Sequence, residues 1–173
     1  QQLDLLYALN EEHAARRDQD AKLEAQIQSF ELVYRMQMEA ADAFDIEREP
    51  ASIREMYGDG VHARQTLIAR RLLERGVRFV QLFHEAWDHH GGLPGALPRL
   101  CKETDQPAAA LVKDLKQRGM LDDTLVLWAG EFGRTVYSQG TLTKTNYGRD
   151  HHPRCFSIFM AGAGIKGGTI HGA

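Results

Sequence analysis

The sequence predicts an α/β fold with a helical first half. Up to residue 76 the apolar side chains recur at helical spacing, whereas from Val77 onward three short apolar runs appear, at 77–83, 123–130 and 155–164. A helical pattern over 104–120 separates the first two runs, and a strand, a helix and a strand at this spacing are typical of a parallel βαβ unit. We therefore expect one domain, in which 77–173 forms a mixed, mostly parallel sheet flanked by helices and 1–76 is a helical segment packed on that sheet.

The helices of the first half are predicted by periodicity and by their end signals. Stretches over 1–17 and from residue 21 to residue 44 are expected to be helical, the second with apolar side chains three or four residues apart. Pro50 marks the start of a short helix and Gly58 its end.

A further helix is predicted over 61–76. Its buried side chains would be Leu67, Leu72 and Leu73, and Gly76 would follow its C-terminus directly. In the second half, the run over 123–130 has a near-continuous apolar centre, which is typical of a strand covered on both faces.

Composition narrows the class of protein. The chain has 173 residues, of which 43% are hydrophobic and 26% charged, values of a globular domain with a core of its own. Its net charge of −3 gives no electrostatic reason to expect nucleic acid or an anionic membrane as a partner. No run approaches the ~18 apolar residues of a membrane span. The chain opens without Met in a helical pattern, so we expect a piece of a longer protein.

Three clusters of polar residues flank the apolar runs. "FHEAWDHHGG" (83–92) and "WAGEFGR" (128–134) each follow a run, and "GRDHHPR" (148–154) precedes one. In open α/β sheets ligands bind beyond the carboxyl ends of the strands, and neighbouring strands lie ~5 Å apart. The clusters therefore predict a metal site, whose candidate ligands are Asp88, His90, Glu131, Asp150 and His151.

The third cluster requires one of two arrangements, because it comes before its strand. Either that strand runs antiparallel to the others, or the loop from Phe132 to Arg149 returns to the same edge of the sheet. Carboxylates and imidazoles together suit zinc, manganese or iron better than a metal that prefers sulfur. Arg134 and Arg149 could bind an oxyanion with two hydrogen bonds each.

Each cluster also has a structural interpretation. Asp150 could be a turn residue with His151 in a partly exposed loop, Glu131 could cap a helix, and "WDHHGG" could be a polar turn that buries Trp87. His84 and Glu85 could support the ligands from a second layer. The joint presence of three clusters favours a metal site over these readings.

Two other motifs carry little function. "GAGIKG" (162–167) fits the dinucleotide glycine pattern, but no helix is predicted to begin within it, so a glycine turn is the better interpretation. Cys101 and Cys155 form no CxxC motif, which argues against a thiol redox protein.

The chain resembles domain-of-unknown-function family 1501, a bacterial family placed among alkaline-phosphatase-like and sulfatase-like proteins. The resemblance rests on "SFELVYRMQMEAADAFDIEREPASIREMYG", "ARRLLERGVRFVQLFHEAWDHHGG", "CKETDQPAAALVKDLKQRGMLDDTLVLWAGEFGRT" and "GRDHHPRCFSIFMAGAGIKGG", which cover nearly the whole chain. It implies an alkaline phosphatase-like fold, of which this chain is a C-terminal fragment. It also implies a metal-dependent hydrolase of sulfate or phosphate esters, small molecules or glycans, exported to the periplasm.

The resemblance also implies roles for single residues. Asp88 and His90 are similar to an Asp…His ligand pair, Glu131 stands at the Asp of an Asp-His pair, and His151 is similar to a later single His ligand. His152 is a weaker candidate than His151 for this last ligand. Arg134 would stabilise the equatorial oxygens of the ester, and the metal would be zinc, manganese, calcium or magnesium.

The chain departs from the superfamily pattern at two places. Phe132 replaces the second residue of the Asp-His pair, so one metal lacks a ligand unless Asp150 supplies it. Nothing matches the early strand that carries the nucleophile, so we expect this fragment alone to be inactive. The alternative function is a non-catalytic sulfatase-like module that binds sulfated or phosphorylated glycans or packs against partner domains.

Overall fold

The structure is a computed structural model that describes residues 2–15, 21–140 and 142–172. The chain divides into two compact units, Gln1–Phe44 and Asp45–Ala173. The first contains α1 (Gln2–Ala15) and α2 (Ala21–Ala43), as the periodicity predicts. Residues 16 and 17 of the first predicted helix lie outside the described residues. Among the helices described, none is long and apolar enough to cross a membrane.

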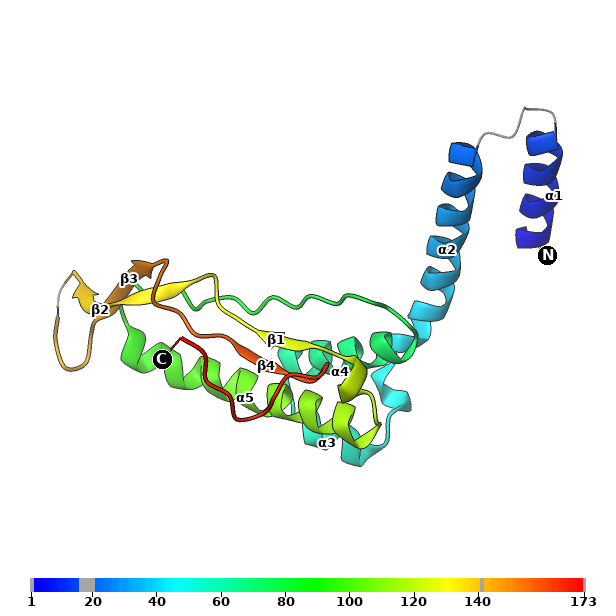
Figure 1. Ribbon diagram of the computed structural model, residues 1–173. Coiled ribbons are helices and arrows are strands. Elements are labelled where there is room, and N and C mark those ends of the chain that lie inside the picture. The colour runs from blue at the N-terminus through cyan, green and yellow to red at the C-terminus, as the bar shows by residue number, and fades with distance from the viewer. Residues whose placement is uncertain (1, 16–20, 141, 173) are drawn as a thin grey trace. The chain divides into compact units, whose positions relative to one another are not determined.

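The second unit combines helices with short strands (Figure 1). Its elements in chain order are η1 (Ile46–Arg48), α3 (Ala51–Tyr57), α4 (Val61–Glu74), α5 (Leu93–Gln117), η2 (Leu121–Asp123), β1 (Val126–Trp128), β2 (Gly133–Gln139), β3 (Gly148–His152) and β4 (Phe159–Ala161). The long helix α5 has the β2–β3 pair beside its N-terminal end and packs on α3 and α4 (Figure 1). A general mixture of helix and sheet is therefore confirmed.

The helix predicted over 61–76 is present as α4. Gly76 adopts a φ of 82° after its end, and its N–H donates to the carbonyl of Leu73 at 2.9 Å. This left-handed position favours glycine, as expected of the residue that follows a helix C-terminus. Leu67 is buried as predicted, whereas Leu72 and Leu73 are only partly buried. Arg70 and Arg71 are buried as well.

Helix α5 begins at Leu93, well before the predicted start at residue 104. The prediction took Pro107 as a residue of the first turn, where proline costs no hydrogen bond. In the structure Pro98 and Pro107 both lie inside the helix. The buried face of α5, which includes Leu100 and Leu115, compensates for the backbone bonds that the two prolines cannot make.

The sheet differs from the mostly parallel sheet that the sequence predicts. Strand β1 pairs with β4, and β2 pairs with β3, both antiparallel and in two separate two-stranded sheets. The third apolar run therefore takes the antiparallel alternative. A large parallel sheet is not present among the described residues.

The predicted strand over 77–83 is not formed. The segment is an irregular stretch between α4 and α5 (Figure 1). Within the described part of the chain, residues 78–86 make no backbone hydrogen bond to another segment. Phe79 and Phe83 are 78% and 80% exposed, so the apolar pattern that predicts a strand lacks both a pairing partner and a covering layer.

The core of the second unit lies between α3, α4 and α5. Tyr57, Leu67 and Ala110 form its buried centre, and Ile53 and Leu111 pack against it. Gln106 on α5 donates hydrogen bonds from its side chain to the carbonyls of Glu55 and Met56, which lie near the end of α3. Helix α5 thus joins α3 by both apolar and polar contacts.

A buried ion cluster joins the same helices. The Arg70 side chain is 0% exposed and lies 2.7 Å from Glu49, 2.5 Å from Glu74 and 2.9 Å from Asp114. Arg118 approaches Asp114 at 2.8 Å, and the hydroxyl of Tyr57 donates to Asp114 at 3.0 Å. The charges balance, because Arg71 also binds Glu49 and the cluster then holds three arginines and three carboxylates, namely Arg70, Arg71, Arg118, Glu49, Glu74 and Asp114.

The arginines determine the ionisation of Glu49. Burial raises the pKa of this carboxyl, but the hydrogen bonds from Arg70 and Arg71 outweigh burial and hold the pKa below its usual range. Buried charges are tolerated only when they are paired and hydrogen-bonded. Loss of any one member would leave an uncompensated charge among the helices.

We predict that Arg70→Met destabilises the second unit by about 3–5 kcal/mol, because Glu49 and Asp114 would lose a buried counter-ion. Urea unfolding followed by circular dichroism measures the change. The matched control is Arg99→Met, which removes an exposed ion pair to Glu103 at 2.6 Å and should cost about 0.5 kcal/mol or less. Equal losses in the two variants would contradict a stabilising role for the buried cluster.

Candidate metal centre

Three basic side chains converge on one oxygen of Asp88. Its Oδ1 lies 2.8 Å from Nε2 of His90, 3.0 Å from Nε2 of His151 and 2.6 Å from an Nη of Arg134. Asp88 and His90 come from the segment before α5, whereas Arg134 and His151 come from β2 and β3. The metal-ligand atoms of Asp88, His90 and His151 all lie within 4.8 Å of one another.

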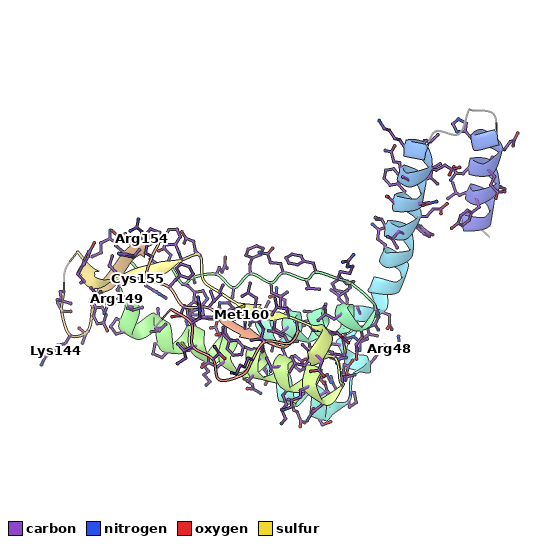
Figure 2. The ribbon with its side chains drawn as sticks, viewed as in Figure 1. Arg48, Lys144, Arg149, Arg154, Cys155 and Met160 are labelled. Carbon is purple, nitrogen blue, oxygen red and sulfur yellow. The ribbon has the colours of Figure 1, made fainter. Side chains whose placement is uncertain are left out.

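The β2–β3 pair brings two of these residues together. Arg134 stands directly opposite His151 in the antiparallel register, and Arg149 on β3 donates its N–H to the carbonyl of His89 at 2.9 Å. Figure 2 shows Arg149 at this end of the unit, and Lys144 in the loop that joins the two strands. The polar clusters therefore meet through a hairpin and a loop, and not along the edge of a parallel sheet.

Gly148 permits the close approach of β3 to the loop. A Cβ built at this position would lie 2.0 Å from the carbonyl carbon of His90. A side chain here would separate the strand from the loop that carries Asp88 and His90. The sequence alone does not indicate this role of Gly148, because His90, the residue that it approaches, is distant from it in the sequence.

The outer nitrogens of the two histidines have acceptors of their own. Nδ1 of His90 contacts Oε1 of Gln139, and Nδ1 of His151 lies 3.5 Å from Oε1 of Glu131. An Nδ1–H that faces an acceptor leaves Nε2 of a neutral imidazole with a lone pair. Both Nε2 lone pairs would then face the Asp88 carboxylate, which is also an acceptor. A proton or a metal cation between them would remove this repulsion.

The donor set fits a divalent cation. Two imidazole nitrogens and one carboxylate oxygen are a usual ligand set for zinc. Ligand atoms around tetrahedral zinc lie about 3.3 Å apart, because its bonds are about 2.0–2.1 Å long. The two distances to Asp88, 2.8 and 3.0 Å, differ from this spacing by only a few tenths of an ångström. The ligand nitrogens of the two imidazoles lie within 4.8 Å of each other.

The two remaining candidate ligands do not join the group. Asp150 accepts the N–H of His151 at 2.8 Å through Oδ1, and its own N–H donates to Oγ1 of Thr135 at 3.0 Å. Its side chain therefore serves the local backbone, but it does so from within β3, and the interpretation of Asp150 as a turn residue is wrong. Glu131 reaches the outer nitrogen of His151. His152 accepts the N–H of Arg154 at 3.3 Å and has no part in the group.

Sequence reasoning missed Gln139 and the strand that carries it. From the sequence, Gly133–Gln139 is expected to lie within a loop, whereas the structure forms β2 there, and Thr135, Val136 and Tyr137 are types favoured in strands. No sequence signal distinguishes Gln139 from other polar residues. Its contact with His90 follows only from the register of β2 against β3.

The ionisation of Asp88 is set by its neighbours. The hydrogen bond from Arg134 is the main cause that holds the pKa of this carboxyl below its usual range, and the charges of His90 and His151 act in the same direction. The ion pair is therefore fully present above the ordinary aspartate pKa. It is lost as the pH falls through the lowered value.

We predict that Arg134→Met raises the pKa of Asp88 toward the ordinary value of about 3.9. The carboxyl carbon of Asp88, followed by ¹³C NMR during an acid titration, measures the shift. Arg154→Met is the matched control, because Arg154 is an exposed arginine two residues beyond β3. An unchanged titration of Asp88 in the Arg134 variant would contradict the ion pair.

Comparison with known proteins gives one assignment. No curated protein and no solved structure matches the chain. The model of a family described as "Protein of unknown function (DUF1501)" matches residues 1–173. Because this match extends over the whole sequence, the chain belongs to the DUF1501 family.

Proposed function

We propose that this chain supplies the divalent-metal site of a hydrolase that acts on sulfate or phosphate esters. The observation that carries the proposal is the approach of two imidazole Nε2 atoms to a single oxygen of Asp88, at 2.8 and 3.0 Å. The residues that would hold the cation are Asp88, His90 and His151. A cation bound there would supply Lewis acidity and positive charge to an ester oxygen.

Glu131 and Gln139 are assigned to the outer layer of the site. Each lies at the Nδ1 nitrogen of a ligand histidine, where an acceptor fixes the tautomer and the ring orientation. This assignment differs from the ligand role that the sequence suggests for Glu131. The two imidazoles favour zinc or manganese over calcium and magnesium, which prefer oxygen ligands.

Arg134 is proposed to bind the oxyanion of the ester. It lies 2.6 Å from Asp88, and its side chain is partly exposed. A cation would share the charge of Asp88, so the guanidinium would become available to a second anion. A planar guanidinium can donate two parallel hydrogen bonds to two oxygens of a sulfate or phosphate group.

The proposal extends to the larger fold. In a mostly parallel, alkaline phosphatase-like sheet, the segment over 77–83 would be a strand. Its unpaired backbone and the exposure of Phe79 and Phe83 support this assignment. No residue of this chain is assigned as the nucleophile. The resemblance attributes that role to an early strand of the superfamily fold.

A second candidate function is a non-catalytic module that binds sulfated or phosphorylated glycans. The position of Phe132 favours it, because the ring contacts the His151 ring edge-on at 5.4 Å between centroids. An apolar ring then stands where the superfamily has a second ligand. A single cation and Arg134 could bind an anionic group without cleaving it.

We predict that the metal-stripped chain takes up a single equivalent of zinc, and that Asp88→Asn, His90→Ala and His151→Ala each abolish stoichiometric uptake. Glu131→Gln should weaken the affinity about 10- to 100-fold, as expected for an outer-layer residue. Inductively coupled plasma mass spectrometry after dialysis measures the uptake. The matched control is His152→Ala, which should retain the metal. Absence of zinc from the wild-type chain would sink the proposal.

We predict that Arg134→Met weakens the binding of phosphate and sulfate to the zinc-loaded chain about 10- to 100-fold, since a charge-assisted hydrogen bond contributes about 1.5–3 kcal/mol. Isothermal titration calorimetry measures the affinity, with Arg154→Met as the control. Hydrolysis of p-nitrophenyl sulfate or phosphate by the full-length protein, lost in Asp88→Asn, would separate the hydrolase from the binding module. Binding without turnover would favour the module.

A further inference from the structure

We infer that His84 and Trp87 form a bracket that positions Asp88 and His90 for cation binding. This inference rests on the proposed function, because it assigns positioning residues to the same site. The two side chains lie on the segment between α4 and α5, and among the described residues no hydrogen bond, ion pair or ring contact joins either of them to Asp88, His90 or His151. They act through the backbone that joins them to Asp88.

His84 is held between two helices. Its Nε2 lies 3.3 Å from Oε2 of Glu103 on α5, and its ring meets the ring of His62 on α4 edge-on at 4.9 Å. The His84 side chain is 19% exposed, whereas the neighbouring Phe83 is 80% exposed. His84 is thus attached to the helices in a stretch that is otherwise open to solvent.

Trp87 completes the bracket by binding back to His84. Its indole N–H donates to Nδ1 of His84 at 2.9 Å. An indole nitrogen can only donate, so Nδ1 must carry the lone pair and Nε2 must carry the proton. The Nε2–H of His84 then faces the Glu103 carboxylate, which is an acceptor. Trp87, His84 and Glu103 thus form a chain in which the indole–imidazole hydrogen bond at 2.9 Å is followed by an imidazole–carboxylate contact at 3.3 Å.

His84 is the attachment point of a stretch without other polar contacts. Among the described residues, none of the residues from Arg78 to Phe83 has a hydrogen bond or ion pair. Without the bracket, the loop that carries Asp88 and His90 would be tied to the body of the unit mainly through β3 and the start of α5. Those contacts are made by residues that follow Asp88 in the sequence, whereas His84 precedes it.

The backbone between the bracket and Asp88 is constrained. Ala86 has a φ of 73°, a left-handed conformation that alanine seldom adopts. The N–H of His89 donates to the carbonyl of Trp87 at 3.0 Å, which closes a tight turn around Asp88. Such a conformation persists only when its surroundings impose it. The His84–Trp87 hydrogen bond spans Ala86 and supplies that constraint from one side.

The bracket also reaches Arg134. The carbonyl of Trp87 lies 3.5 Å from an Nη of this arginine, and another Nη of Arg134 pairs with Asp88. The position of Trp87 therefore affects both the cation ligand and the proposed oxyanion-binding residue.

The test uses Trp87→Phe, which keeps an aromatic ring and removes the indole N–H. Long-range ¹H–¹⁵N NMR of the metal-free chain should show His84 of the wild type with its proton on Nε2. Trp87→Phe should convert this single tautomer into a mixture. A proton on Nδ1 of wild-type His84 would overturn the bracket, since the indole could not then donate to it.

Zinc affinity is the second readout. Trp87→Phe and His84→Leu should each weaken zinc binding about 10- to 100-fold, and His84→Asn should restore part of it because its amide oxygen can accept the indole N–H. Phe83→Leu is the matched control and should bind zinc as the wild type does. The cobalt(II) absorption spectrum should change in Trp87→Phe, whereas the thermal unfolding midpoint should change little.

The two proposals fail in different ways. A wild-type chain that binds no zinc would refute the metal site, and the His84 tautomer would still decide whether the bracket exists. A wild-type chain that binds zinc, together with unchanged affinity and spectrum in Trp87→Phe, would refute the positioning role.

Discussion

The buried ion cluster around Arg70 is the interaction on which the second unit depends. A fully buried guanidinium requires carboxylates at fixed positions, and these come from Glu49 before α3, Glu74 on α4 and Asp114 on α5. Because a charge in the protein interior is stable only with its partners in place, the cluster restricts how α4 and α5 can pack. The apolar core centred on Leu67 would allow more freedom, since apolar contacts have no direction.

This restriction extends to the candidate site through the two helices. His62 on α4 and Glu103 on α5 are the groups that hold His84, and the start of α5 is tied to the β2–β3 loop by the hydrogen bond from Leu93 to Tyr147. The same helices therefore support the loop of Asp88 at one side and the strand of His151 at the other. The candidate site consists of a loop and a small hairpin, and helices α4 and α5 hold these two segments in position.

The sequence predicts part of this organisation. The polar clusters beside apolar runs predicted that Asp88, His90 and His151 lie close together, and these three side chains do converge. The prediction depended on the joint presence of the clusters, because each cluster alone also has a structural interpretation. The helix ends at Gly58 and Gly76 were also predictable, since glycine at such positions has a direct conformational reason.

Other features could not be predicted because they depend on contacts between distant segments. Arg70 in a helical pattern looks like a surface residue until its three carboxylates are placed around it. The segment over 77–83 has the composition of a strand, yet a strand also needs a neighbour to accept its hydrogen bonds, and none is present in the described chain.

The absence of a side chain at Gly148 also has a consequence for inheritance. Because even one methyl group would push β3 away from His90, a relative with any larger residue at this position would lose the approach of His151 to Asp88 and His90. A single codon therefore marks where this arrangement of side chains can persist.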